Sequence, residues 1–533
     1  MKKNKIKEIL DNHPHYRETL FCRGYLITNS KVNLSSYPFY DQWKKCPFGS
    51  LNNDFELNIF CHKWQNCYIY EKNGLKISLI GHAYNPFDMK HKEEEILKDC
   101  LMAYTQSLEA FFDKISELTG IHLIILNDNG KLIAVQDCSG RQACCYGLLK
   151  KDVYITSHPQ LVADICNLDM DPFIKKLTGK WFYKYSNNHL PGNLTPYKEL
   201  KNLGPNIYLE YKESFNINRF FPVKPHPELK PEEYEKTVDS IISLLNKNIQ
   251  LCVQRWKKTA ISLTGGVDSK TTLACANGLY DKLKCFTFHS KPSEVIDANA
   301  AYIICKELGI DHKIYPIQNN NLEVKDYSLL KQVITHNLSY SSILKENEVR
   351  KYIYFYRKED FDVELKSNVS EIGRVSREQR GGVIFPDILT PRHFSVLQAK
   401  YVFSPFLMRK ADNCYANYLK EINLDMPLYN YKHIDLHFWE IYSTFWGSTV
   451  IVGQNIFRRT VTMPFNNRKL IDMFLWFPKE YRKSDMLHKE ITKRANSLIS
   501  TLEINIRSPY LSNKRILLEK LYYKYTFLFY RKK

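Results

Sequence analysis

Several signatures of common protein classes are missing from this sequence of 533 residues. None of its 14 cysteines forms a C-x-x-C pair, which excludes the usual zinc and iron–sulfur spacings. No run of 18 apolar residues occurs, so we expect no membrane-spanning helix, and the charged first 13 residues lack the apolar core of a signal peptide. Scattered cysteines at this density are typical of buried thiols in a reducing compartment, and we therefore expect a cytoplasmic protein.

Acidic residues are fewer than basic ones. The 76 Lys and Arg residues exceed the 57 Asp and Glu residues, which leaves a formal charge of +19. Such an excess can indicate an anionic partner such as nucleic acid, a nucleotide or membrane lipid. The charge is not gathered into one patch, and no aromatic–basic recognition motif accompanies it. We therefore interpret most of it as general composition and expect no nucleic-acid partner.

The last twenty residues, 514–533, depart from this even distribution. They contain seven basic residues, one acidic residue and a dense set of aromatic and aliphatic side chains. A basic amphipathic helix on a membrane surface has this composition, and so does a C-terminal helix that docks on the body of a protein. We favour docking.

Short strands dominate the first 225 residues. Residues 122–127 and 131–136 are β-type runs joined by the turn Asp128-Asn-Gly130, which predicts a hairpin, and residues 153–156 form a third run. Apolar residues at helical spacing predict a helical stretch over 92–118. This mixture indicates an α+β domain.

A proline-rich stretch at 221–231 has four prolines in eleven residues and marks a domain boundary. It divides the chain into a domain of residues 1–225 and a domain of residues 226–533. Strands and helices then alternate, which predicts an α/β domain with a doubly wound parallel sheet and a mostly helical part from about residue 325. The expected strands are 260–263, 284–289 and 313–317, and the expected helices between them are 270–278 and 295–308.

The sharpest motif is Ser262-Leu-Thr-Gly-Gly-Val-Asp-Ser-Lys270, between a predicted strand and a predicted helix. Two glycines allow the backbone to approach an anion, and the helix N-terminus offers free N–H groups and a positive dipole end. Thr264 and Ser269 add hydroxyls, and Asp268 adds a carboxylate that could hold Mg²⁺ bound to the same phosphates. The alternative is a plain turn with Asp268 or Ser269 as N-cap. The first βα turn of a parallel sheet is where phosphate sites form, which favours the functional interpretation.

The segment Thr264-Gly-Gly-Val-Asp-Ser269 resembles the S-G-G-x-D-S pyrophosphate loop of ATP pyrophosphatases, which split ATP between its α- and β-phosphates and adenylate a substrate. A series of further segments, in order along roughly residues 75 to 500, resembles the asparagine synthetase-like branch, whose first domain is a class II glutamine amidotransferase. These segments are Asp137-Cys-Ser-Gly140-Arg141 with Tyr146-Gly147, Leu190-Pro-Gly192, Arg219-Phe-Phe-Pro222, Asp297 with Leu308-Gly309, and Met463-Pro-Phe-Asn466.

The resemblance implies an N-terminal-nucleophile-hydrolase-like β-sandwich flanked by helices, followed by a PP-loop sheet, with ATP and Mg²⁺ as cofactors. It implies that Asp268 and Glu371 hold Mg²⁺ and carry catalysis, and that Phe288 lies beside the base. The remaining residues that it assigns to ATP binding are Ser262, Leu263, Thr264, Gly265, Gly266 and Ser269.

Three positions depart from the family pattern. Glutamine-using members begin Met-Cys, whereas this chain begins Met1-Lys2-Lys3, and a lysine cannot replace a thiolate that forms a thioester. We therefore expect the first domain to be degenerate. Asn368 falls where synthetases place a glutamate proposed as general base, and an amide cannot take a proton. Arg507 falls where relatives use a lysine in the step from adenylate to product.

These features predict an ATP-dependent ligase that adenylates a carboxylate, transfers it to an amine and releases AMP and pyrophosphate, without a glutaminase of its own. Its partners would be a small-molecule carboxylate and a small-molecule amine, and the sequence allows a homodimer. Two alternatives stay open: an asparagine synthetase that uses ammonia or glutamine, and a non-catalytic nucleotide-binding scaffold. His433 and His437 form the one H-x-x-x-H pair, but no third ligand is evident, so we expect a structural role for them.

Overall fold

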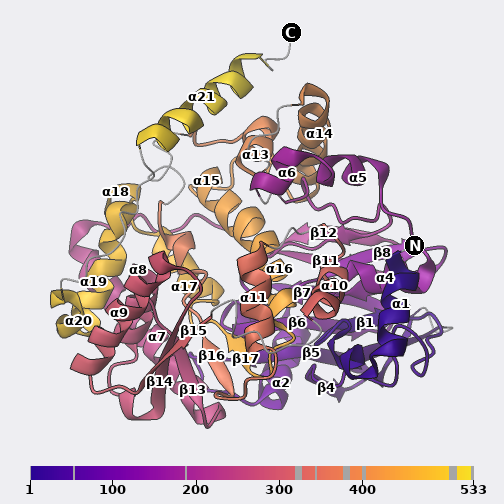
Figure 1. Cartoon of the computed structure of the whole chain (residues 1–533), viewed down its shortest axis with the longest axis horizontal. Helices are drawn as coiled ribbons and strands as arrows, with labels where there is room; N and C mark the ends of the chain where they lie inside the picture. Colours follow the sequence, from indigo (N-terminus) through magenta and orange to yellow (C-terminus); the bar gives the residue numbers. More distant parts are fainter. Residues whose placement is uncertain are drawn as a thin grey trace.

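The structure is a computed structural model that describes residues 2–51, 55–186, 189–317, 327–341, 345–375, 385–398, 404–502 and 513–529. Figure 1 shows the antiparallel sheets of the first half, in indigo to magenta, beside the parallel sheet of the second half, with a group of helices above them.

Two six-stranded sheets, in which neighbouring strands run antiparallel, form the first half. Their strand orders are β10-β8-β9-β1-β3-β2 and β12-β11-β7-β6-β5-β4. The first sheet consists of β1 (Tyr25–Thr28), β2 (Trp43–Leu51), β3 (Phe55–His62), β8 (Cys145–Leu149), β9 (Asp152–Thr156) and β10 (Lys201–Asn202). The second consists of β4 (Cys67–Lys72), β5 (Leu75–Tyr84), β6 (Thr119–Asp128), β7 (Lys131–Gln136), β11 (Ile207–Tyr211) and β12 (Phe215–Arg219).

The two sheets pack face to face because alternate side chains of each strand point to opposite faces. In the second sheet, Ile80 and Leu123 join the core between the sheets, whereas Leu79 and Ile124 pack with helices α2 (Glu93–Gln106) and α3 (Leu108–Ser116). On the first sheet, Leu26 packs in a separate cluster with α1 (Lys2–Asn12) and α4 (Pro159–Cys166). The result is the predicted sandwich flanked by helices.

Local sequence decides the connections within this half. The predicted hairpin is confirmed as β6 and β7, and its turn residues Asn129 and Gly130 both have positive φ (49° and 93°), as a two-residue hairpin loop requires. The predicted helical stretch over 92–118 is not continuous. The extended backbone of Ser107 ends α2, and its Oγ accepts a hydrogen bond from the N–H of Ala110 at 3.0 Å, which caps α3.

The second half contains the predicted doubly wound parallel sheet. Its strands β13 (Thr259–Ser262), β14 (Leu283–His289), β15 (His312–Pro316), β16 (Val363–Leu365) and β17 (Thr460–Thr462) lie in the order β15-β14-β13-β16-β17. Apolar residues of α7 (Tyr234–Arg255), α8 (Val267–Cys275) and α9 (Pro292–Glu307) cover one face with Ile261, and those of α10 (Tyr327–Asn337) and α11 (Glu346–Phe355) cover the other with Ala260.

The rest of the second half is helical, as predicted. Its helices are α13 (Pro391–Gln398), α14 (Pro405–Glu421), α15 (His433–Leu436), the π-helical segment η6 (His437–Ser443), α16 (Thr444–Gln454), α17 (Arg468–Leu475), α18 (Lys479–Arg482), α19 (Met486–Ala495), α20 (Ser497–Thr501) and α21 (Asn513–Phe529). Within the described ranges, no helix is long and apolar enough to cross a membrane.

Buried polar contacts join the two halves. The side-chain amide of Asn466, which follows β17, donates to the carboxylate of Asp137 at 2.9 Å, and the hydroxyl of Ser139 donates to Asn466 Oδ1 at 2.7 Å. Thr119 at the start of β6 donates to Asn248 of α7 at 2.9 Å. These contacts pair two segments of the family-like series, the one at Asp137 and the one at Asn466. The division of the chain near residue 225 stays a prediction.

Candidate functional site

The candidate site lies where the order of the parallel strands reverses. β13 is central, with β14 on one side of it and β16 on the other. After β13 the chain continues to β14 on one side of the sheet, and after β16 it continues to β17 on the other side. The carboxyl ends of two such strands border a crevice in which open α/β sheets bind ligands. The loop at 263–266 follows β13, and residues 366–369 follow β16.

Hydroxyl groups hold the loop after β13 in place. Ser269 Oγ accepts from the N–H of Thr264 at 3.1 Å and donates to the carbonyl of Thr264 at 3.0 Å. The hydroxyl of Thr264 accepts from the N–H of Gly266 at 3.1 Å. These bonds bend the loop back over the N-terminus of α8. The first-turn N–H groups of α8 have no partner within the helix, so the loop brings a positive dipole end to the crevice.

Gly265 is required by close packing. A Cβ at this position would lie 3.1 Å from the Cβ of Ala300 and 3.4 Å from Oδ1 of Asp297, both on α9. A larger side chain would push the loop away from α9. Close packing against α9 therefore favours glycine at this position, in addition to the close approach of an anion that the sequence suggests.

Asp268 is held from the opposite side of the crevice. Its Oδ1 accepts from the hydroxyl of Ser370 at 2.6 Å, and its Oδ2 accepts from Arg374 Nη1 at 2.7 Å. The Nε of Arg374 also donates to Asp485 at 2.7 Å, and Nε2 of His488 lies 3.8 Å from Asp268 Oδ1. The carboxylate is thus fixed by residues of the segment after β16 and of the region that begins α19.

Glu371 lies in the short helix η5 (Ser370–Gly373), directly after Ser370. Burial raises the pKa of its carboxyl to about 7, and the negative charge of Asp268 adds to this rise. The charges of Arg141 and Arg374 act in the opposite direction. The structure therefore brings the two predicted metal ligands, Asp268 and Glu371, close enough for their charges to interact.

The two carboxylates fit a Mg²⁺ ion. Hard oxygen ligands suit this cation, which is bound in nucleotide sites by one or two carboxylates together with substrate phosphates. Burial and, after it, repulsion by Asp268 raise the pKa of Glu371, and a divalent cation bound by both carboxylates would relieve the repulsion. Within the described ranges, no group of three or more His, Cys, Asp and Glu side chains forms a metal site.

Cationic side chains surround the loop. Burial lowers the pKa of Lys270, on the first turn of α8, and the positive charge of Lys489 on α19 lowers it further. Two like charges beside a helix N-terminus favour an anionic ligand. Arg459 is engaged elsewhere in the sheet, because its Nε donates to the buried carboxylate of Glu364 on β16 at 2.7 Å.

The remaining residues predicted to bind ATP lie in or beside the strands of the parallel sheet. Ser262 is the last residue of β13, and the polar backbone groups of Leu263 are used by the sheet, where its N–H donates to Phe286 O and its carbonyl accepts from Thr287. Phe288 packs against α11, with its ring 4.9 Å from Nζ of Lys351, on the face of the sheet opposite α8. Its predicted place beside the adenine base stays a prediction. Arg507 lies outside the described residues.

Sequence reasoning missed Ser370, Arg374 and Asp485. The first two belong to the same short segment as Glu371, and Arg374 follows it by three residues, so a hydroxyl and a cation beside a predicted carboxylate were a usable signal. Asp485 could not be found this way because 111 residues separate it from Arg374. Arg141 is a further case: its guanidinium is buried, its Nη2 donates to Ser443 Oγ at 2.8 Å, and its charge reaches Glu371 from the first half.

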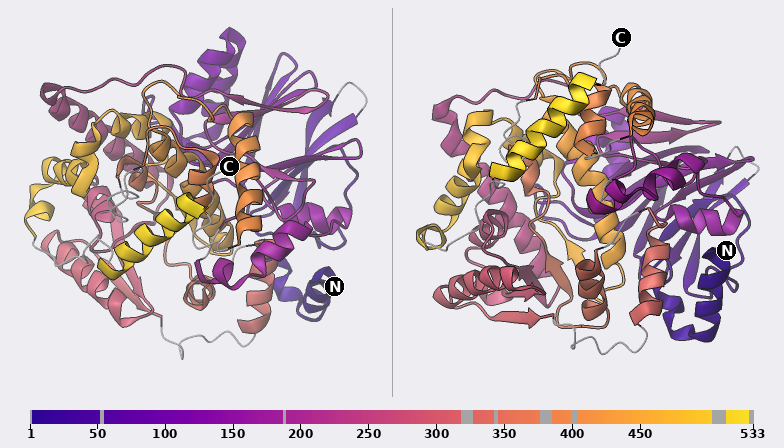
Figure 2. Two further views of the ribbon diagram at one scale, coloured as in Figure 1. Left: turned by 90° about the horizontal axis from the view of Figure 1, so that it is seen from above. Right: turned by 45° about the horizontal axis from the view of Figure 1, so that its top comes forward.

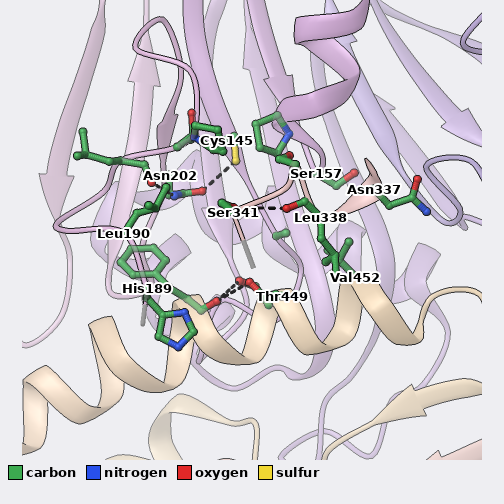
Figure 3. Close-up of a pocket in the computed structure, with 18 of the residues that line it drawn as sticks. Cys145, Ser157, His189, Leu190, Asn202, Asn337, Leu338, Ser341, Thr449 and Val452 are labelled. Atoms are coloured by element: carbon green, nitrogen blue, oxygen red, sulfur yellow. Dashed lines mark hydrogen bonds between the residues drawn. The ribbon is translucent and has the colours of Figure 1, made fainter. Parts of the chain in front are cut away.

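A separate cavity of about 100 Å³ lies between the first half, the end of α10 and α16 (Figure 3). Cys145 lines it and donates from Sγ to Asn202 Oδ1 at 3.0 Å, and Ser157 and Thr449 add hydroxyls. Its lining, all of it from the described part of the chain, includes none of the residues predicted to bind ATP.

His433, one of the two histidines of the H-x-x-x-H pair, has a structural role, because its ring accepts from the N–H of Leu389 at 3.2 Å.

Comparison with known protein families gives a match in the region of the parallel sheet. A family model described as Asparagine synthase matches residues 240–337. This segment contains β13, the loop with Asp268, α8, β14, α9 and β15, and Glu371 lies beyond it. The chain is therefore similar to asparagine synthases in the part that contains the glycine-rich loop after β13. No curated protein is matched by the whole sequence.

Two solved structures are similar at a low level. A glutamine phosphoribosylpyrophosphate amidotransferase from B. subtilis, complexed with ADP and GMP, is 9% identical, with a TM-score of 0.23 over 58% of this chain and 62% of that chain. A second, described as the allosteric regulatory enzyme of purine biosynthesis, is 9% identical, with a TM-score of 0.23 over 76% of each chain. The match spans less than two thirds of the first protein, and at these scores neither likeness carries an argument.

Proposed function

We propose that this protein is an ATP-dependent amide-forming ligase that releases AMP and pyrophosphate. The observation that carries the proposal is the T-G-G-V-D-S loop at the reversal point of a doubly wound parallel sheet, within a segment similar to asparagine synthases. The charge of Asp268 in this loop acts on Glu371. The first-turn N–H groups of α8 would bind the phosphates, and Thr264 and Ser269 would hold the loop in the shape that presents them.

Catalysis in this proposal rests on positioning and charge. A substrate carboxylate oxygen attacks the α-phosphorus of ATP, the bond to the β-phosphate oxygen breaks, and pyrophosphate leaves with its electron pair. An amine then attacks the acyl carbon, loses a proton, and expels AMP. Mg²⁺, held by Asp268 and Glu371, would neutralise charge on the leaving pyrophosphate. Lys270 would neutralise further charge, while Ser370 and Arg374 orient the Asp268 carboxylate.

The amine in this proposal is ammonia or an amino group of a larger substrate, not ammonia made from glutamine by this chain. A glutaminase of this class needs a reactive thiolate. Burial raises the pKa of Cys22, which directly precedes the turn into β1, to about 12, and its Sγ donates to the carbonyl of Asn455 at 3.1 Å. Burial also raises the pKa of Cys145, in the cavity of Figure 3, well above its ordinary value. Thiols held in the protonated form support the proposal that the first half has no glutaminase activity.

The test is the fate of ATP. ATP labelled at the α-phosphate, Mg²⁺ and a panel of carboxylic acids and amines are incubated with the full chain, and labelled AMP and pyrophosphate are measured. Asp268→Ala should abolish turnover, and Asp281→Ala, at an exposed aspartate in η3 (Tyr280–Lys282), is the matched control that should leave it unchanged. Release of ADP and phosphate instead of AMP, or full turnover by Asp268→Ala, would show that the loop is wrongly assigned.

An asparagine synthetase that uses free ammonia is the second candidate, because the matched family model carries that description. Asn368 makes this second candidate less favoured, because Asn368 falls at the position of the proposed general base and an amide cannot accept a proton there. Aspartate, ammonia and MgATP should therefore give no asparagine. Stoichiometric asparagine and AMP would establish the second candidate in place of the first, and no turnover with any acid would favour a nucleotide-binding scaffold.

A further inference from the structure

The C-terminal helix α21 uses one face to dock on the protein. Tyr522, Tyr523 and Thr526 are buried, and the carbonyl of Thr526 accepts from Arg392 Nη1 of α13 at 3.1 Å. The ring of Phe527 lies 4.7 Å from that of His393. Both views of Figure 2 show α21, in yellow, lying on the outside of the molecule. Docking therefore covers one face of the helix.

An apolar stripe lies on the outward side of α21. Leu517, Leu518 and Leu521 expose 58%, 55% and 53% of their surface. Successive residues of a helix are turned by about 100°, so these three leucines share one side and the buried residues 522, 523 and 526 lie on another. Three neighbouring leucines that are each more than half exposed form an apolar stripe on the outward side of the helix.

Basic side chains border this apolar stripe. Lys514, Lys520 and Lys524 are exposed on the same helix. The segment 514–533 has seven basic residues and one acidic residue in its sequence. A second copy of this chain would bring the same positive charges against them, whereas an anionic surface would be attracted. Apolar residues beside lysines are the combination that binds the boundary between lipid headgroups and acyl chains.

Neighbouring helices on the same side of the molecule add to this surface. Figure 1 places α6 (Trp181–Ser186), α13, α14 and α21 together at the top, and the left view of Figure 2 looks down on them. Phe406 of α14 is 54% exposed, and the ammonium groups of Lys176 and Lys410 lie 5.1 Å and 5.0 Å from the centre of its ring. Trp181 of α6 is 66% exposed. Exposed aromatic side chains and lysines thus also occur on other helices at this end of the molecule.

We propose that this side of the protein binds the surface of an anionic lipid bilayer, with α21 lying in the plane of the headgroups. Leu517, Leu518 and Leu521 enter the acyl boundary, and Lys520 and Lys524 contact headgroup phosphates. The helix lies on the membrane and does not span it. The proposal does not depend on the ligase activity proposed above, because it rests on the outward face of α21 and the exposed residues of neighbouring helices, and not on the site at Asp268.

The test is co-sedimentation of the full chain with vesicles of phosphatidylcholine containing about 30 mol% phosphatidylglycerol, compared with pure phosphatidylcholine. Binding is expected to the anionic vesicles only, and it should weaken as salt is raised from about 0.1 M to about 0.5 M. The triple variant Leu517→Gln, Leu518→Gln, Leu521→Gln removes exposed apolar surface with good helix formers and should lower affinity at least about tenfold. The double variant Lys520→Gln, Lys524→Gln should lower it by roughly tenfold and flatten the salt dependence.

Matched controls separate the site from the general charge of the protein. Leu498→Gln, at a leucine of α20 that is 44% exposed, and the double variant Lys44→Gln, Lys257→Gln, at two exposed lysines of the sandwich and the second half, should bind as the parent chain does. Equal loss in these controls, no binding to anionic vesicles, or equal binding to neutral ones would overturn the proposal. Light scattering that shows a dimer lost in the triple leucine variant, without vesicle binding, would assign the face to a second copy instead.

Discussion

Replacing Glu371 by glutamine is the sharpest perturbation of the candidate site. Burial and the charge of Asp268 raise the pKa of Glu371 from 4.5 to about 7. A carboxyl whose pKa is higher in the folded state stabilises the protein below its unfolded pKa, and this stabilisation is lost as pH rises through the folded pKa. At 1.36 kcal/mol per pKa unit, the contribution is about 2 kcal/mol at about pH 5.5 and close to zero at about pH 8.

The assay is urea-induced unfolding of the parent chain and of Glu371→Gln at several pH values between about 5.5 and about 8. The difference in unfolding free energy between the two proteins should change by about 2 kcal/mol over this range, because glutamine does not titrate. Mg²⁺ added at about pH 8 should stabilise the parent chain by binding the ionised pair, and it should stabilise Glu371→Gln less.

Glu364→Gln is the matched control, with the opposite electrostatics. Burial alone would raise the pKa of Glu364, but the charges of Lys366 and Arg459 lower it to about 2. Ionised Glu364 stabilises the folded protein at pH values above the pKa of the unfolded state, and this stabilisation is lost only as pH falls toward about 2. Glu364→Gln should therefore lower the free energy of unfolding equally at about pH 5.5 and about pH 8. If the Glu371→Gln difference were equally independent of pH, Glu371 would not be a buried carboxyl beside Asp268.

Two further predictions concern the joint between the halves, and both are read by denaturant or thermal unfolding. Gly447→Ala places a Cβ 1.3 Å from Nη1 of the buried Arg141, so the free energy of unfolding should fall by about 3 kcal/mol, and an unchanged Tm would contradict this packing. Asn466→Ala removes the side-chain amide that donates to the buried carboxylate of Asp137, which keeps its backbone N–H donors, and should cost about 2 kcal/mol. Asn466→Asp should cost more, because it sets a second carboxylate beside the first, and an aspartate variant as stable as the alanine variant would refute the hydrogen bond.

Local patterns in the sequence were sufficient wherever the structure is local. The Asn129-Gly130 turn specifies the β6–β7 hairpin because both residues adopt positive φ, and alternation of apolar strands and helices specifies the parallel sheet. Periodicity failed at Ser107, where a single capping serine interrupts an otherwise continuous apolar pattern. A helix cap depends on the side chain and the backbone conformation of a single residue. The spacing of apolar residues carries no information about either, so it could not predict the break at Ser107.

The sequence by itself located the glycine-rich loop between β13 and α8, since two glycines and three polar side chains stand between an apolar strand and a helix start. It also indicated that Glu371 belongs with Asp268, through the family resemblance. Only the tertiary structure decided that Arg374 bridges Asp268 to Asp485, and that Asn466 closes on Asp137, because these pairs are more than 100 residues apart in the chain. The same holds for α21: its composition allowed either docking or a membrane surface, and the packing of Tyr522, Tyr523 and Thr526 decided which of its faces is left outward.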